Sequence, residues 1–316
     1  MLKKKIAPYT YQFIKYYRDK YISAQLNENY KYLGDNNLEN AYKAICNILK
    51  SEKPCMISRF GSNELDTTLN YKKGHPLSFL RNIYPFWVSR TTKERMLINA
   101  GFFPNDNKSL SKFADLIISI VSNIDILGVW VGTEENLPLS TSCKRVNLMS
   151  LEPFWSKSPW TKELEGRKII VVHPFAESIR KQYVQRELLF ENKDILPEFA
   201  SLTVVKAVQS IGGVTNGFNT WFDALHYMEN EIDKVDYEIA LIGCGAYGMP
   251  LAAHCKKMGK KAVHLGGALQ LLFGIRGNRW ETEQDIYKQF MNEHWVRPLE
   301  SERPKAAQNV ENACYW

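Results

Sequence analysis

Residues 236–280 read DYEIALIGCGAYGMPLAAHCKKMGKKAVHLGGALQLLFGIRGNRW, and this stretch decides the fold. A short apolar run precedes Gly243, Gly245 and Gly248, which are spaced as G-x-G-x-x-G, and a helical pattern then continues to Gly259. Glycines at this spacing let backbone N–H groups approach a phosphate at the start of a helix, where aligned peptide dipoles favour negative charge. The stretch therefore predicts a strand, a glycine turn, a helix and a second strand around a nucleotide.

A dinucleotide cofactor needs more than this turn. Enzymes that bind NAD or FAD commonly carry an Asp or Glu about 20 residues further on, which holds the ribose. Here the second strand ends in HLGG at residues 264–267, so an imidazole and a glycine loop occupy that position. The missing acid disfavours a dinucleotide enzyme. A second alternative is a Rossmann-type methyltransferase that uses S-adenosylmethionine, because the sequence LIGCGAYG resembles the cofactor loop of such enzymes. The missing acid disfavours this alternative as well. A turn that serves only helix–sheet packing is a third alternative.

Strand and helix patterns alternate along the rest of the chain. Continuous apolar runs are typical of parallel strands that are covered on both faces, and such runs occur at residues 55–60, 124–131, 168–172 and 202–208. Helical patterns lie between them, at residues 110–122, 177–190 and 222–232. We therefore expect an α/β fold with a doubly wound, mostly parallel, Rossmann-like sheet. Residues 75–104 are rich in aromatic residues and proline, have no clear period and predict an irregular insertion or lid, whereas residues 133–166 are polar and contain proline.

The chain divides most simply into a helical N-terminal extension, residues 1–50, and one Rossmann-like domain, residues 51–316. Asn37 is a predicted N-cap of the last helix in the extension, and Pro54 marks its end. The apolar sequence ENACYW at residues 311–316 predicts that this end packs back on the domain.

Composition places the chain among globular proteins. Its 316 residues are 45% apolar and 24% charged, and no apolar run approaches the 18 residues that would span a bilayer. Six cysteines show neither a C-x-x-C pair nor zinc-like spacing, and no secretory signal is seen, so we expect a cytoplasmic protein with reduced thiols.

The first twenty residues are basic and aromatic within a net charge of +7. This pattern favours peripheral contact with anionic lipid at the inner membrane face, or a helix that packs on the domain. Nothing else in the chain supports nucleic-acid binding.

Ligands of parallel α/β sheets bind beyond the carboxyl ends of the strands. That rule gathers four loops, residues 59–66, 173–178, 243–248 and 264–270. Their cations, amides, carboxylates and backbone donors suit a phosphorylated ligand rich in hydroxyl groups, such as a nucleotide sugar. The candidate binding residues are Arg59, Gly61, Ser62, Asn63, His173, Glu177, Gly243, Gly245, Gly248, His264 and Gln270.

These candidates have structural alternatives. Arg59 is a candidate diphosphate clamp, although an arginine at a strand end also pairs readily with a carboxylate. His173 and His264 each follow a strand, where an imidazole either binds phosphate or sugar or serves as a structural donor. Glu177 and Gln270 either hold sugar hydroxyls or serve helix capping and the surface.

The sequence RFGSNEL at residues 59–65 resembles the R-F-G-D-G-E loop of GT-D-type bacterial glycosyltransferases. HPFAES at residues 173–178, and the stretch quoted first, are similar to segments of related capsule and glycan-assembly proteins. The resemblance implies a nucleotide-sugar-dependent glycosyltransferase of surface-polysaccharide or glycoprotein assembly. Its partners would be a nucleotide-sugar donor and a glycan or lipid-linked acceptor.

In that family the D-x-E pair of the loop is associated with a divalent metal, Mn or Mg, and with the sugar nucleotide. This chain departs from the pattern, because Ser62 and Asn63 leave Glu64 as the only acid of the motif. Asp66 would point about 200° around a helix from Glu64, so the two carboxylates would not share one ion. Metal dependence is therefore left open by the sequence, with Glu64 as the one candidate ligand.

Glu64 is instead the candidate catalytic base, since sugar transfer with inversion needs a carboxylate that takes the proton of the acceptor hydroxyl. An acid in the first turn of a helix, where it favours the dipole, is the structural alternative. The loss of the family's first acid also motivates a further hypothesis, a non-catalytic protein that binds nucleotide sugars.

Overall fold

The computed structural model describes residues 37–74, 88–304, 307–309 and 313–316. Within them, seven parallel strands form one sheet in the order β3-β2-β1-β7-β6-β4-β5. The strands are β1 (Cys55–Arg59), β2 (Ile126–Val129), β3 (Lys144–Asn147), β4 (Lys168–His173), β5 (Ser201–Lys206), β6 (Ile239–Ile242) and β7 (Lys261–His264). The predicted doubly wound α/β fold is confirmed.

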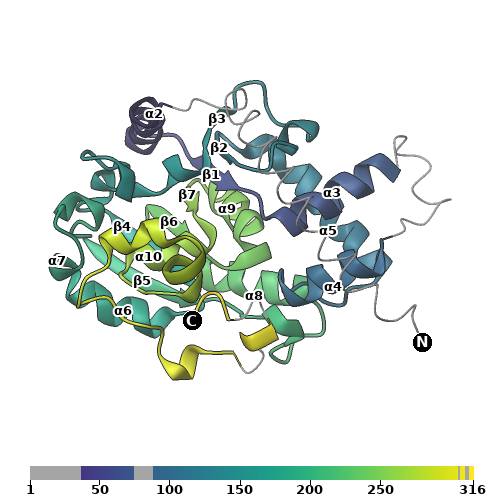
Figure 1. Cartoon of the computed structure of the whole chain (residues 1–316). Helices are drawn as coiled ribbons and strands as arrows, with labels where there is room; N and C mark the ends of the chain where they lie inside the picture. Colours follow the sequence, from purple (N-terminus) through teal and green to yellow (C-terminus); the bar gives the residue numbers. More distant parts are fainter. Residues whose placement is uncertain (1–36, 75–87, 305–306, 310–312) are drawn as a thin grey trace.

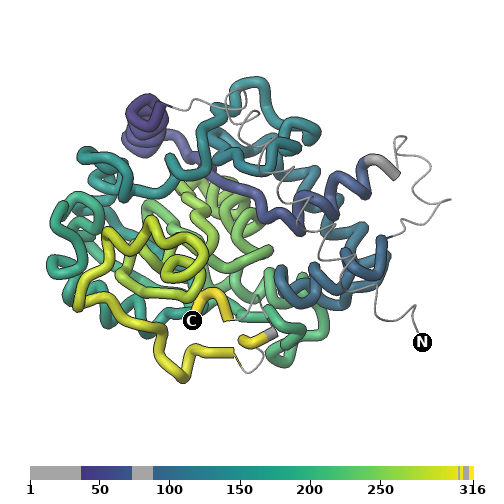
Figure 2. Tube along the Cα trace, in the orientation of Figure 1, coloured from purple at the N-terminus to yellow at the C-terminus, as the bar shows by residue number. Residues whose placement is uncertain are grey.

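Helices cover both faces of this sheet (Figures 1 and 2). One layer holds α3 (Ser62–Gly74), α4 (Arg90–Ile98), α5 (Asn107–Ile120), α8 (Trp221–Asp233) and α9 (Gly248–Lys257). The other holds α2 (Leu38–Lys50), α6 (Ala176–Val184), α7 (Arg186–Leu189) and α10 (Leu269–Leu272). Successive strand residues enter opposite layers, as the period of two requires: Ile170 and Val172 pack in the first core, and Ile169 and Val171 in the second.

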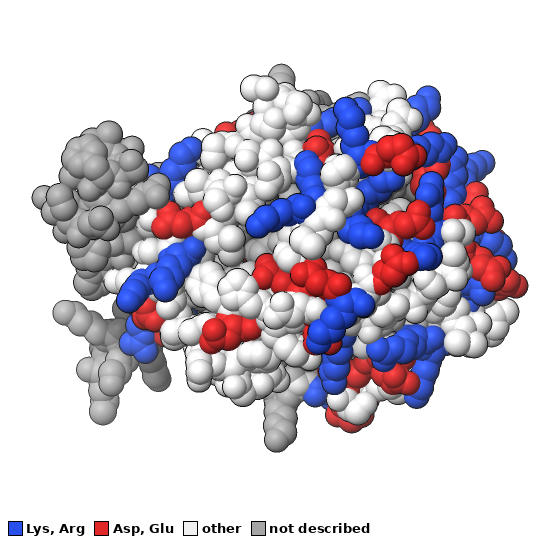
Figure 3. All heavy atoms as spheres, turned by 180° about the vertical axis from the view of Figure 1, so that it is seen from behind, with Lys and Arg blue, Asp and Glu red and all other residues white. Residues whose placement is uncertain are grey.

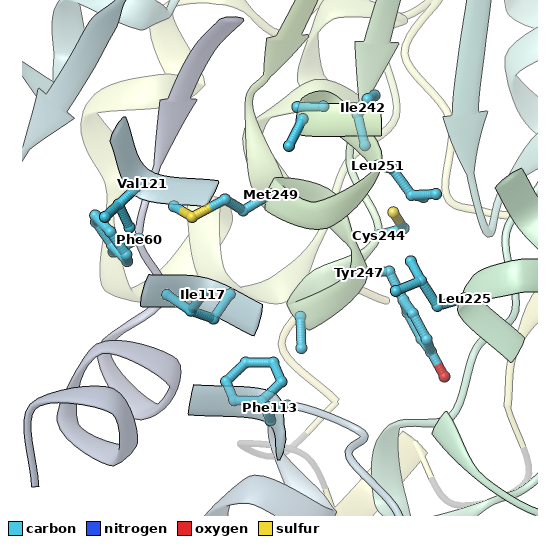
Figure 4. Packing of buried hydrophobic residues seen from close by; sticks show 14 of the residues in the cluster. Phe60, Phe113, Ile117, Val121, Leu225, Ile242, Cys244, Tyr247, Met249 and Leu251 are labelled. Carbon is cyan, nitrogen blue, oxygen red and sulfur yellow. The ribbon is translucent and has the colours of Figure 1, made fainter. Parts of the chain in front are cut away.

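The first core packs α5 and α9 against the sheet (Figure 4). Phe113, Ile117 and Val121 lie near Phe60 and Met249, and all five are at most 4% exposed. Trp221 stacks on Tyr247 with ring centroids 4.7 Å apart, which fixes the start of α9 against α8. The glycine turn after β6 thus packs against the aromatic and aliphatic side chains of the first core.

Helix α2 begins as predicted, because Asn37 accepts a hydrogen bond from the N–H of Asn40 at 3.1 Å. Its apolar face, which includes Tyr42 and Ile45, is buried in the second core. Residues 1–36 lie outside the described residues, and so does the predicted membrane-contacting segment. Residues 313–316 pack on the domain as predicted, with Trp316 7% exposed.

Two elements were not predicted, and residues 75–87 of the predicted irregular insertion lie outside the described residues. Residues 90–98 form α4, which Ser89 caps by accepting from the N–H of Thr92 at 3.1 Å. Its weak amphipathic pattern hid it. Residues 144–147 form β3, an edge strand of only four residues with a single fully buried side chain, Val146. Both elements gain their stability from tertiary packing, which overrides weak local preference.

No helix among the described residues has the length and apolarity to cross a membrane. The six cysteines are buried and free of disulfide bonds. On the face shown in Figure 3, acidic and basic side chains are interspersed.

Candidate nucleotide-sugar site

A cavity of about 960 Å³ opens at the carboxyl ends of the strands. Its volume falls within the usual range of small-molecule sites, roughly 300 to 1,000 Å³. All four predicted loops contribute to its wall, so Glu64 and Gly245 face one space although they are distant in sequence. The predicted residues that line it are Arg59, Gly61, Ser62, Asn63, Glu64, His173, Gly243, Gly245, His264 and Gln270.

The sheet topology places this cavity. The chain leaves β4 toward β5 at one edge of the sheet, whereas it leaves β6 in the opposite direction, toward β7. Since β4 and β6 are neighbours, the loops that follow them diverge and leave a crevice between them. His173 and Gly243 stand at the two sides of that switch point.

Arg59 ends β1 and is held rigidly in the cavity wall. Its Nε and Nη2 donate to the carbonyl of Phe60 at 3.2 and 2.9 Å, and its guanidinium lies 5.1 Å from the centre of the Trp130 ring. Gly266, whose φ is +63°, makes room for it, because a Cβ there would lie 2.9 Å from Arg59 Nη1. The loop after β7 therefore needs glycine to pass beside the arginine.

Charges of both signs surround Arg59. Burial lowers its pKa, whereas Tyr315, Glu64 and Glu152 raise it and Arg279 lowers it further. The guanidinium stays charged, since the pKa of arginine normally exceeds 12. Two arginines, Arg59 and Arg279, and four acidic residues, Glu64, Glu152, Glu283 and Asp285, thus line one cavity, which is the charge pattern for a ligand that carries both phosphates and hydroxyls.

Glu64 lies in the first turn of α3 and folds back over Gly61. A Cβ on Gly61 would sit 2.1 Å from Glu64 Oε2, so the glycine of RFG leaves the space that the carboxyl group fills. Burial raises the pKa of Glu64, and its own backbone N–H and Arg59 oppose that shift. No side chain of another described residue donates a hydrogen bond to its carboxyl group, whereas the Thr68 hydroxyl donates to its backbone carbonyl at 2.8 Å. A raised pKa makes this carboxylate a stronger base than an exposed glutamate.

Asp66 points away from the cavity. It is 46% exposed and lies 3.9 Å from Arg95, as the turn of α3 requires. Within the described ranges, no group of three or more His, Cys, Asp or Glu side chains is arranged to hold a metal ion. The residues of this loop do not form a two-carboxylate grip, because Ser62 stands beside Glu64 and Asp66 is turned outward.

The glycine turn brings three loops into contact. A Cβ on Gly243 would lie 2.6 Å from the carbonyl oxygen of Gly266 and 3.0 Å from Cδ2 of His173. Gly245 has a φ of +58°, and a Cβ on it would meet only the carbonyl oxygen of Ala100, at 3.9 Å. The 3-10 turn Gly245–Tyr247 leads into α9 with no acid and no side-chain cap, and Gly245 and Tyr247 line the cavity. The backbone of this turn, at the positive end of the α9 dipole, is thus the part that can meet an anion in the cavity.

Gly248 lies outside the cavity and serves packing. A Cβ there would lie 2.2 Å from Nε2 of His264, so α9 can approach β7 only because the residue is glycine. The imidazole is itself fixed, since its Nδ1 lies 3.1 Å from Oγ of Ser58. This close approach of helix and strand is the role that the third glycine of the motif usually has.

We expect Gly248→Ala to lower the free energy of unfolding by about 1 to 3 kcal/mol, because the added methyl group collides with His264. In an open helix the same change would stabilise by up to about 1 kcal/mol. His264→Ala removes the obstacle, so the double variant should lose less than the sum of the single losses, by at least about 0.5 kcal/mol. Urea unfolding measures all four proteins. Strictly additive losses would contradict the contact.

Both predicted histidines are buried and neutral. Burial lowers the pKa of His173 to about 3, and burial followed by the charge of Arg59 does the same for His264. Neither imidazole therefore supplies a cation to phosphate at neutral pH. Nδ1 of His173 accepts from the N–H of Phe175 at 3.0 Å, so Nε2 carries the hydrogen. His173 is thus a neutral donor at the cavity wall.

Glu177 is placed away from the other candidates. It is exposed, pairs with Arg180 at 3.2 Å and does not line the cavity. Helix α6, which it begins, is closed to a ligand, because Glu302 accepts from the N–H groups of Glu177 and Ser178 at 2.7 and 3.2 Å. An internal carboxylate thus occupies this helix start. The turn before α9, by contrast, carries no acid and no side-chain cap.

Gln270 is buried and structural. Its amide Nε2 lies 3.2 to 3.3 Å from the carbonyl oxygens of Ile275, Arg276 and Tyr315. The amide therefore joins α10 to the C-terminal segment. Its nitrogen is not available to sugar hydroxyls, which corrects the expected binding role for that atom.

Several cavity residues lie outside the predicted set, among them Trp130, Glu152, Arg279 and Tyr315. Nη1 of Arg279 lies 3.2 Å from the hydroxyl of Tyr315, and the guanidinium lies 4.8 Å from the centre of that ring. Tyr315 also packs on Gly267, where a Cβ would lie 2.6 Å from the tyrosine ring. For Tyr315, the only indication in the sequence was the prediction that residues 311–316 pack on the domain.

No protein-family model and no curated protein matches this chain. A similar solved structure is described as "Selenomethionine substituted structure of domain of unknown function 1792 (DUF1792)". It shares 13% sequence identity with this chain, covers 80% of it and 81% of its own length, and has a TM-score of 0.33. We assign function from the residues of the cavity.

Proposed function

We propose that this protein is a glycosyltransferase that moves a sugar from a nucleotide donor to a glycan or lipid-linked acceptor in bacterial surface-polysaccharide or glycoprotein assembly. One observation carries the proposal: Glu64, Arg59 and the glycine turn that leads into α9 line a single cavity. The resemblance of RFGSNEL to the GT-D loop supplies the pathway. The absence of an acid at the end of β7, where His264 stands, disfavours a methyltransferase.

The diphosphate of the donor would lie at the glycine turn. There the backbone N–H groups of residues 245–247, just before α9, and the guanidinium of Arg59 meet its negative charge. When the bond between the sugar's anomeric carbon and the phosphate oxygen breaks, the leaving diphosphate gains charge. Preorganised donors at that place stabilise the transition state more than the ground state.

Glu64 would act on the acceptor. Its carboxylate takes the proton of the acceptor hydroxyl while that oxygen attacks the anomeric carbon and the diphosphate departs with the bonding electrons. The raised pKa of Glu64 makes it a stronger base than an exposed glutamate. Its place over Gly61, beside Arg59, sets it next to the proposed diphosphate position.

A thermal-shift screen tests the proposal directly. We expect one nucleoside diphosphate, from a panel that covers the common bases, to raise the melting temperature. A ligand at one hundred times its Kd adds about 2.7 kcal/mol to the free energy of unfolding. Arg59→Gln should remove most of this gain, and Arg90→Gln, which changes an exposed arginine of α4, should not.

NAD and S-adenosylmethionine complete the panel. A shift with either of these alone, or no shift with any nucleoside diphosphate, would refute the proposed donor class. A donor that binds but is neither hydrolysed nor transferred would identify the non-catalytic alternative.

A further inference from the structure

Glu152 adds a carboxyl group to the cavity wall from a segment that lies outside the four predicted loops. It follows the short 3-10 helix at Leu148–Leu151, and it is only 8% exposed. Trp155 Nε1 and the Tyr287 hydroxyl donate to its Oε2 at 2.9 and 2.7 Å. Its backbone carbonyl accepts from the hydroxyl of Tyr42 on α2. Side chain and backbone are thus fixed from three directions.

The other oxygen of this carboxyl group faces the ligand space. Both donors use Oε2, and no described residue donates to Oε1. Among the described residues, the side-chain atoms that are fully buried and have no partner do not include Oε1 of Glu152. This oxygen is therefore accessible, and since Glu152 lines the cavity, it is accessible from the cavity. A carboxylate oxygen accepts about two hydrogen bonds, and polar atoms in such enclosed places normally find partners.

The surrounding charges indicate which part of a ligand lies here. Glu152 raises the pKa of Arg59, as Glu64 does, so the guanidinium has a carboxyl group of each residue nearby. A phosphate that approached Glu152 would be repelled, whereas a hydroxyl group would donate to it. Burial raises the pKa of Glu152, and the hydrogen bonds from Tyr287 and Trp155 and the charge of Arg59 act against that shift.

We propose that Glu152 binds hydroxyl groups of the transferred sugar through Oε1 and thereby selects the sugar of the donor. This inference rests on the proposed glycosyltransferase function. The sugar is bonded directly to the terminal phosphate, so a diphosphate at Arg59 and α9 brings it beside the carboxyl groups that flank Arg59. Glu64 then serves the acceptor, and Glu152 holds the group that is transferred.

Glu152→Gln tests this role with little change of shape. Because Trp155 and Tyr287 both donate to one oxygen, the amide oxygen takes that place, and the NH2 group faces the cavity. The variant therefore replaces an acceptor by a donor. Trp155→Phe is the matched control, since it removes one bond to Oε2 and Trp155 does not line the cavity.

Titration calorimetry compares a nucleoside diphosphate with its nucleotide sugars, for example uridine diphosphate with its glucose, galactose and N-acetylglucosamine derivatives, in the three proteins. We expect Glu152→Gln to weaken the preferred nucleotide sugar at least tenfold and the free diphosphate less than threefold. Trp155→Phe should change neither by more than threefold. Donors that lack single hydroxyl groups locate the contact: one deletion should weaken binding to the wild type and leave binding to Glu152→Gln unchanged.

The outcomes separate the two proposals. If Glu152→Gln weakens diphosphate and nucleotide sugar equally, or neither, Glu152 does not hold the sugar, and the proposed function stands. If the wild type binds no nucleoside diphosphate and no nucleotide sugar, both proposals fail. Melting curves check the fold of each variant. If Glu152→Gln melts more than about 5 °C lower, Glu152→Asp, which retracts the carboxylate by one methylene, replaces it in the same comparison.

Discussion

Glu64→Gln is expected to lower the rate of sugar transfer by about 10² to 10⁴, the usual contribution of a general base. Glutamine fills the same space over Gly61, so the diphosphate site at Arg59 and α9 should keep its affinity within about threefold. We therefore expect kcat to fall while the Kd of the donor remains nearly unchanged. A steady-state assay of transfer, paired with titration of the nucleoside diphosphate, measures the two effects separately.

Asp66→Asn is the matched control for this prediction. It removes a carboxylate two residues away on the same helix, one that faces solvent and Arg95 rather than the cavity. Its kcat/KM should stay within about twofold of the wild type, as is usual for exposed positions. Equal losses in both variants would indicate damage to α3 instead of lost proton transfer. Undiminished transfer by Glu64→Gln would refute the base.

The fold was predictable wherever sequence period and burial agree. β4 and β6 are buried on both faces, and their continuous apolar runs indicated this without ambiguity. β3 is short and lies at the edge of the sheet, and three of its four side chains are not fully buried. Its sequence, KRVN, therefore has almost none of the apolar pattern that predicts a strand. The same reason applies to α4, whose position depends on contacts with α3 and with residues 211–213.

The site was predictable up to the limit of the carboxyl-end rule. That rule placed Arg59, Glu64 and Gly245 together because each lies at the carboxyl end of a strand of a parallel sheet or within a few residues of it. It says nothing about residues that reach the cavity from elsewhere. Glu152 and Tyr315 arrive from a loop between β3 and β4 and from the end of the chain, and only long-range packing brings them in.

The histidines show where residue type alone misleads. His173 and His264 follow strands, as phosphate ligands often do, yet both are buried and neutral. The sequence cannot show that Gly248 admits α9 so close to β7 that His264 is enclosed. Sequence position indicated the neighbourhood of these side chains, and packing density decided their charge.

These two histidines should make the protein sensitive to mild acid. Each has a pKa of about 3 in the folded protein and about 6.5 when unfolded. Between these pH values the unfolded chain binds a proton that the folded protein does not. The contribution of each neutral histidine to the free energy of unfolding is therefore fully present above about pH 6.5 and is lost as the pH decreases. From pH 7 to pH 5 each histidine should remove about 2 kcal/mol, and the pair about 4 kcal/mol, from the free energy of unfolding.

The buried acids act in the opposite direction. The raised pKa values of Glu64 and Glu152 let the folded protein take up protons before the unfolded chain does, which adds stability as the pH falls. Comparison with variants isolates the histidine contribution. His173→Asn and His264→Asn should each flatten the decline between pH 7 and pH 5 by about 2 kcal/mol in urea unfolding, and the double variant by about 4 kcal/mol. Curves that run parallel to the wild type would show that the imidazoles are charged or hydrated in the folded state, and the proposed neutral donor at His173 would then be wrong.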